Sequence, residues 1–94
     1  MHTKVIYKYQ LAVQEVQELE LPANSKILSV QFQGEQLYLW AMVNKESGAV
    51  IHKHTIEIYG TGQDITYDLG VRRNHIATVQ SQGFVWHIFE YLGF

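Results

Sequence analysis

Residues 26–44 constrain the fold of this 94-residue chain more than any other segment. Two runs of alternating apolar residues, 26–33 and 36–44, flank a short polar break at Gly34-Glu35. Alternation with a period of two is typical of β-strands, and a two-residue break that contains glycine is typical of a hairpin. We therefore expect this segment to carry the core of a small all-β domain.

The two strands of this hairpin differ in how their faces are composed. The first alternates apolar with polar residues, whereas the second is apolar on both faces. The strand 36–44 is therefore either covered on both sides or presents Tyr38, Trp40 and Met42 to a partner. The expected inward positions are Leu28, Val30 and Phe32 in the first strand, with Ser29, Gln31 and Gln33 outward, and Leu37, Leu39, Ala41 and Val43 in the second strand.

The rest of the chain repeats this pattern of short alternating runs and polar breaks. A helix is the alternative to a strand only over 13–21, where we favour the strand. The expected strands are a half-exposed edge strand at 4–12, then 13–21, 26–33, 36–44, 50–59, 75–82 and 84–91, with turns at 22–25, 45–48 and 82–83 and a long loop at 63–74. Short connections favour antiparallel neighbours. We predict one domain over 1–94, a β-sandwich or partly open barrel of six to seven strands.

Composition excludes several classes of protein. The net charge of −2 provides no basic field, so we expect no nucleic acid as a partner. The absence of cysteine excludes disulfides and thiolate zinc sites. The chain has no apolar run of about 18 residues, so we expect no membrane span. We also expect no signal peptide, because Lys4 and Lys8 interrupt the N-terminal segment.

One candidate site would bind an anion. The backbone amides of Gly60-Thr61-Gly62 could cradle a phosphate, the cluster Arg72-Arg73 could grip it, and Tyr59 or Tyr67 could stack on a base. The alternatives are a turn that needs a positive φ at one glycine and arginines that pair with Asp64 or Asp68. The sequence leaves both interpretations open.

The histidines offer a second candidate. His52 and His54 share one face of a strand, and His75 or His87 could complete a three-histidine metal site. The alternative is that they are packed or surface residues, and we predict no metal and no cofactor. Asp64 and Asp68 do not form a recognisable acid–base pair, and we predict that the protein is not an enzyme.

The aromatic residues offer a third candidate. Tyr38, Trp40 and Trp86 are either core residues or exposed anchors for a partner protein or for self-association. The apolar C-terminal segment 91–94 would fray unless it is docked. Docking on the same chain and docking on a second copy are equally consistent with the sequence.

The order of five sequence blocks carries a family resemblance. The blocks are Lys26-Ile-Leu-Ser-Val-Gln, Leu39-Trp-Ala-Met-Val, Ile58-Tyr-Gly-Thr-Gly62, Ile76-Ala-Thr-Val-Gln80 and Val85-Trp-His-Ile-Phe-Glu90. From Tyr7 to Glu90 the chain resembles a family of short uncharacterised proteins of bacteriophages and prophages. Members of that family carry a more arginine-rich segment where this chain has Ile51-His-Lys-His54. The resemblance implies a phage setting and a location in the host bacterial cytoplasm.

Together these observations predict a protein that works by binding. The leading hypothesis is a phage accessory protein that binds a host protein, with inhibition of a host defence system as its specific form. Tyr38, Trp40 and Trp86 would be the anchors and Arg72 and Arg73 the rim. The alternatives are an oligomeric sponge that sequesters a nucleotide signal through the anion site, and a structural component of the virion.

Overall fold

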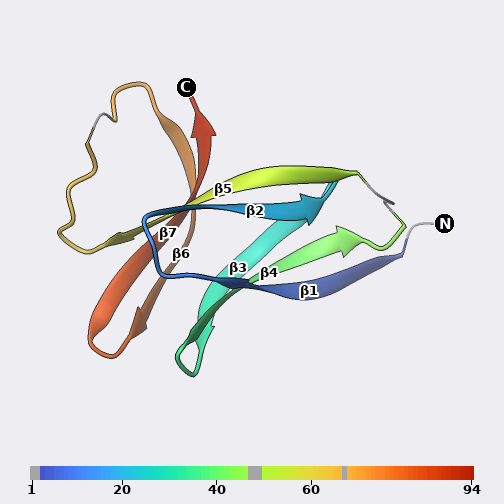
Figure 1. Ribbon diagram of the computed structural model, residues 1–94, viewed down its shortest axis with the longest axis horizontal. Coiled ribbons are helices and arrows are strands. Elements are labelled where there is room, and N and C mark those ends of the chain that lie inside the picture. Colours follow the sequence, from blue (N-terminus) through green and yellow to red (C-terminus); the bar gives the residue numbers. More distant parts are fainter. Residues whose placement is uncertain (1–2, 47–49, 67) are drawn as a thin grey trace.

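The computed structural model describes residues 3–46, 50–66 and 68–94, which form seven strands and no helix (Figure 1). The strands are β1 (Lys4–Leu11), β2 (Val16–Pro22), β3 (Lys26–Gln33), β4 (Gln36–Asn44), β5 (Ile51–Gly60), β6 (Arg72–Ser81) and β7 (Phe84–Gly93). They build a three-stranded sheet ordered β1-β4-β3 and a four-stranded sheet ordered β2-β5-β7-β6, with antiparallel pairing throughout. The predicted all-β fold, a sandwich or partly open barrel, is confirmed.

The core lies between the two sheets, where the inward faces of both meet. The inward face of β4 is buried as expected, and it packs against the central strands of the second sheet. The buried apolar residues of this core are Leu11, Leu21, Val30, Leu37, Leu39, Ala41, Val43, Ile56, Ile58 and Ile88. Burial of such side chains contributes roughly 1.5–3 kcal/mol each. Burial of the side chains that alternate in the sequence is therefore the main source of the stability of the fold.

The chain passes repeatedly from one sheet to the other. β1 pairs with β4 rather than with β2, which belongs to the second sheet. The edge strands β3 and β6 pack against each other on one side of the sandwich. Figure 1 shows β1 at the margin of the molecule, where its second edge has no neighbouring strand among those described.

Two hairpins confirm the turn signals. Gln82 and Gly83 have φ values of 54° and 85°, and a two-residue hairpin with positive φ at both positions matches the right-handed twist of its strands. Gly34 has a φ of 60° between β3 and β4. The turn after β2 places Asn24 at a φ of 65°, a conformation that asparagine tolerates better than most residues. The expected loop at 45–48 lies partly outside the described residues.

One inward assignment was wrong. Leu28 is 39% exposed, whereas Ile27 packs against the core and pairs with Ala41. The register between β3 and β4 shifts between Ile27 and Ser29, so a β-bulge inserts Leu28 as an extra residue. The bulge moves the first part of the strand to the opposite phase, while Val30 and Phe32 keep the expected side.

The boundaries of two segments also differ from the prediction. The favoured strand over 13–21 is confirmed from Val16 onward. The strand predicted at 75–82 begins three residues earlier, at Arg72, so Arg72 and Arg73 lie in β6 and not in a loop. Two register shifts in β6 break its alternation near Arg73 and His75, which explains why the sequence pattern failed there.

Candidate functional site

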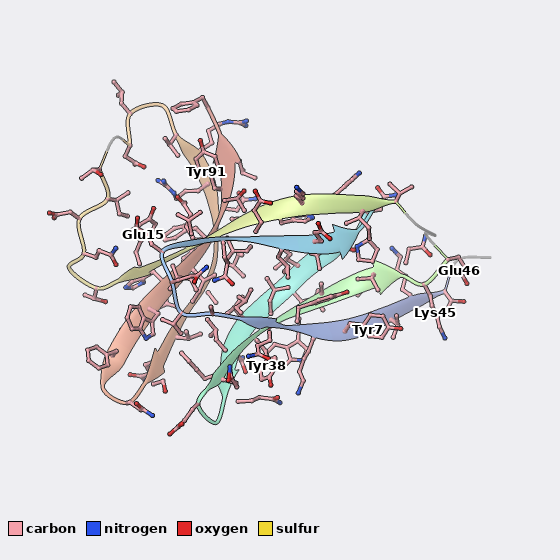
Figure 2. All side chains as sticks on the ribbon, in the orientation of Figure 1. Tyr7, Glu15, Tyr38, Lys45, Glu46 and Tyr91 are labelled. Carbon is pink, nitrogen blue, oxygen red and sulfur yellow. The ribbon has the colours of Figure 1, made fainter. Side chains whose placement is uncertain are left out.

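The outer surface of the three-stranded sheet carries Tyr38, Trp40 and Met42, which we call the aromatic face. These residues point away from the core because they alternate with the buried positions of β4. Tyr38, labelled in Figure 2, meets the Trp40 ring edge-on with 6.1 Å between centroids. All three side chains are half-buried. The structure thus resolves the alternative for 36–44 in favour of one core face and one outward apolar face.

Lysines surround the aromatic face. Register places Lys8 opposite Trp40, Lys26 opposite Met42 and Lys4 opposite Asn44, all on the outward side. Lys8 Nζ lies 4.4 Å from the Tyr38 ring centroid and donates a hydrogen bond of 2.8 Å to Gln33 Oε1. The remaining outward positions of these strands are Ile6, Gln10, Ser29, Gln31, Gln33 and Gln36, and none carries a carboxylate. A cationic surface therefore lies on a chain whose net charge is −2.

A buried ion pair lies on the outer surface of the four-stranded sheet. Glu57 is only 6% exposed, and its carboxylate accepts hydrogen bonds from Tyr59 Oη at 2.9 Å and from Arg73 Nε at 2.8 Å. Arg73 also donates to Asp68. Hydrogen bonds to both carboxylates raise the pKa of Arg73 above its ordinary value. Burial, followed by the bond to Glu57, raises the pKa of Tyr59 to about 12.

A second polar chain lies beside this pair. Thr78 Oγ1 is 2.9 Å from His75 Nε2 and 3.0 Å from His87 Nδ1, and His87 Nε2 is 2.8 Å from Thr61 Oγ1. The Phe89 ring lies edge-on to both His75 and Tyr59. These contacts hold the aromatic and imidazole rings in place on β6 and β7.

A third polar group lies on the opposite side of the same sheet. His54 Nδ1 is 2.6 Å from Glu90 Oε2, with both side chains about one-fifth exposed. Glu90 lines an open cleft of about 500 Å³, together with Ser25, which precedes β3, with Lys26 and Leu28 from the start of β3, and with Asn74 from β6. The cleft lies where β3 and β6 meet.

Trp86 lies apart from the aromatic face. It projects from β7 toward the sandwich interior, stacks on Phe84 at 6.0 Å, and lines a cleft of about 290 Å³ with Phe32 and Val13. A side chain on Gly60 would approach the Trp86 ring to 3.3 Å, so the glycine allows the ring to pack there. Tyr38 and Trp40 thus share one surface, and Trp86 belongs to another.

The predicted anion site is assembled only in part. Tyr59 and Arg73 do meet, but they meet on Glu57. Two of the three amides of the cradle already have partners, because Gly60 N donates to Gln63 Oε1 and Thr61 N donates to Val85 O. Gly62 has the positive φ, 86°, that the turn interpretation requires. Arg72 is exposed, and Tyr67 lies outside the described residues.

The histidines considered for a three-histidine site do not come together. His54 faces the sandwich interior, whereas His75 and His87 lie on the outer surface of the same sheet. Within the described part of the chain, no group of at least three histidine, aspartate or glutamate side chains is arranged to hold a metal ion. The same part contains no helix long and apolar enough to cross a membrane.

Sequence reasoning missed both carboxylates that organise the four-stranded sheet. Glu57 interrupts a run of apolar residues, Ile56 to Tyr59, and a lone charge in such a run signals a buried partner. Glu90 sits in a similar position after Ile88 and Phe89. Neither pattern identifies the partner of its carboxylate, because Arg73 lies far from Glu57 in the sequence and His54 lies far from Glu90.

The fold and its surfaces define a small antiparallel β-sandwich with an outward aromatic face on one sheet and a buried ion pair on the other. The chain belongs to the family described as a domain of unknown function, DUF7352, which matches residues 2–93. No curated protein and no solved structure matches the chain. Membership in an uncharacterised family agrees with the resemblance drawn from the five sequence blocks, and the phage setting stays a prediction.

Proposed function

We propose that this protein is a non-enzymatic accessory protein of a phage or prophage that binds a host protein through the aromatic face. The observation that carries the proposal is the outward side of β4, where Tyr38, Trp40 and Met42 stand on a surface turned away from the second sheet. Half-exposed aromatic residues at the centre of a surface are the usual anchors of protein interfaces.

The surroundings of the aromatic face indicate the chemistry of the partner. Lys4, Lys8 and Lys26 and several glutamines form a rim without carboxylates. Potentials at interfaces are complementary, so the partner would present carboxylates around an apolar centre. Trp86, which we also expected among the anchors, stacks on Phe84 elsewhere and does not belong to this interface.

The mechanism would be steric occlusion. A rigid sheet surface binds with little loss of conformational entropy, which favours tight binding by a small protein. The specific form of the proposal is a host protein that serves in defence against phages, and the host cytoplasm is the compartment. The family resemblance supports this setting, and the residues of the aromatic face support the binding mode.

The test begins with affinity capture from lysate of a bacterial host, using wild type and Trp40→Ala side by side. A partner that wild type retains and Trp40→Ala loses is identified, purified and measured by calorimetry. We expect Trp40→Ala to weaken binding by roughly 30-fold or more, as for a central anchor. Lys8→Glu should slow association and weaken the salt dependence of binding, because Lys4 and Lys26 remain.

Phe84→Ala is the matched control, because Phe84 is 64% exposed but lines the cleft with Trp86 and Phe32, away from the aromatic face. It should leave affinity for the identified partner unchanged. Equal retention of every partner by wild type, Trp40→Ala and Lys8→Glu, with all three proteins folded, would overturn the proposal.

A nucleotide sponge is the second candidate, and the cleft beside Lys26 supports it. Its volume of about 500 Å³ lies in the range of small-molecule sites. Arg73 contributes less than expected, since Glu57 and Asp68 already neutralise it. A thermal-shift panel of cyclic and adenine nucleotides tests the idea, and a saturating ligand at about 100 times its Kd would add roughly 2.7 kcal/mol to the free energy of unfolding. A panel without any shift would remove this candidate.

A further inference from the structure

We propose that β1 is a self-association edge, along which two copies of this chain pair antiparallel into one continuous six-stranded sheet. This inference does not depend on the proposed function. It starts from the position of β1 at the end of the order β1-β4-β3, which leaves one side of its backbone without a strand partner among the described residues.

The other three edge strands carry features that discourage pairing. β3 has a bulge at Leu28, and β6 has two register shifts. β2 ends in Pro22, the single proline of the chain. Bulges and prolines interrupt the backbone pairing of an edge strand, whereas the lysines of β1, Lys4 and Lys8, oppose pairing only in registers that bring them together. In contrast, β1 pairs with β4 over all its residues without a register shift.

One hydrogen bond shows which amides of β1 point outward. Lys45 N donates to Thr3 O at 2.8 Å, so Thr3 and Lys45 form a hydrogen-bonded pair that continues the β1–β4 ladder. Such pairs alternate along an antiparallel ladder. Val5, Tyr7, Tyr9 and Leu11 therefore bond to β4, whereas Lys4, Ile6, Lys8 and Gln10 direct their N–H and C=O groups to the free edge.

The same reasoning explains the position of Pro22. Glu15 and Ala23 bond to β5 through Ile58 N and Val50 O, so the even-numbered residues of β2 face its free edge. Pro22 is one of them, and its missing N–H removes an outward donor without cost to the β2–β5 ladder.

The charges of β1 select one register for the pairing of two copies. The N–H and C=O groups at the free edge of one copy must bond to the N–H and C=O groups at the free edge of the other. Only even-numbered residues can therefore form hydrogen-bonded pairs across the new edge. When Tyr7 lies opposite Tyr7 of the second copy, Lys4 faces Gln10 and Lys8 faces Ile6. The next register in one direction places Lys4 opposite Lys8 of the second copy, and the next in the other direction places the two Lys8 side chains opposite each other. Both are unfavourable, because like charges lie directly opposite.

The exposed apolar residues of β1 fit this register. Ile6 is 53% exposed and Tyr7 is 46% exposed, although the strand belongs to the core sheet. At the two-fold axis, the two Tyr7 rings would form a non-hydrogen-bonded pair, the closest type of cross-strand contact. Each Ile6 would lie along the aliphatic stem of a Lys8. Figure 2 shows Tyr7 on β1 at the margin of the molecule, where a second copy would meet it.

Engineered cysteines report directly which residues of the two copies lie opposite each other, because the chain has no cysteine of its own. Tyr7→Cys places two thiols opposite each other at about 4.5 Å between Cα atoms, within the range of a disulfide. Ile6→Cys and Lys8→Cys are matched controls on exposed neighbours, whose copies would lie roughly 8 Å apart, which is too far for the bond. We expect Tyr7→Cys to oxidise to a linked dimer at least about 10-fold faster than either control.

Ile6→Pro tests the backbone bonds. It removes an outward N–H and leaves the bonds to β4 intact, so the variant should keep the circular dichroism of wild type but sediment as a monomer of 10.9 kDa. Glu20→Pro, at an outward position of β2, should keep the wild-type dimer. A wild type that sediments as a monomer at every concentration would overturn the inference. So would preferential linking of Ile6→Cys or Lys8→Cys, or rates equal for all three cysteine variants.

Discussion

Arg73 Nε lies 2.8 Å from Glu57 Oε1, and the two side chains are 14% and 8% exposed. They come from β6 and β5, two strands that are not neighbours in the four-stranded sheet, since β7 lies between them. The pair therefore bridges across a strand and holds the outer surface of this sheet together. The arginine that the sequence offered as an anion-binding residue instead neutralises a buried carboxylate.

Removal of Arg73 should destabilise the fold. Arg73→Ala leaves the Glu57 carboxylate buried without its cation, and we expect a loss of about 3 kcal/mol in the free energy of unfolding, measured by urea denaturation. Arg72→Ala is the matched control, because Arg72 is exposed, and it should change stability by less than about 0.5 kcal/mol. Equal effects of the two substitutions would contradict a structural role for the pair.

The free energy of unfolding should depend on pH in the alkaline range because of Tyr59. Its pKa is about 12 in the folded chain and close to the ordinary value of 10.0 after unfolding. A raised folded pKa means that the contribution is complete below pH 10 and is lost as the pH rises from 10 through 12. Tyr59→Phe should flatten the stability profile in this window and remove the tyrosinate absorbance step of highest pH. A wild-type titration in which every tyrosine ionises near pH 10 would disprove the assignment.

The bulge in β3 makes opposite predictions for two adjacent residues. Ile27 packs against the core, whereas Leu28 is 39% exposed. We expect Ile27→Ala to cost about 2 kcal/mol and Leu28→Ala less than about 1 kcal/mol in chemical denaturation. The reverse order would show that β3 keeps a regular register without the bulge.

One substitution in the turn between β6 and β7 should stabilise the fold. Gln82 has a φ of 54°, a conformation that costs energy for glutamine and much less for asparagine. Gln82→Asn creates the Asn-Gly pair that this turn favours, and it should raise the melting temperature by a gain of about 0.5 kcal/mol. The bond from Gln82 Nε2 to Glu35 Oε1, 3.2 Å long, is exposed, and its loss should offset little of the gain. Gln31→Asn, within β3, serves as a control and should not stabilise.

Much of the fold could be predicted from local pattern. The period of two assigned Val30, Leu39 and Val43 to buried faces, and the pair Gln82-Gly83 marked a hairpin, because both signals reside in neighbouring residues. The candidate site was harder to predict. The sequence left Trp40 open between a core position and an exposed anchor, and the structure places it on the outward face of β4, whereas Trp86, the other candidate anchor, lines a different surface.

By itself, the sequence determined which segments are strands and which side of most strands is apolar, because side chains on an extended backbone alternate whatever the strand lies beside. Only the tertiary structure decided that β1 joins β4, that Arg73 meets Glu57, and that His54 and His87 lie on opposite sides of one sheet. Those relationships join residues far apart in the chain, where the choice of partner depends on how whole strands order into sheets and on bulges that shift their phase.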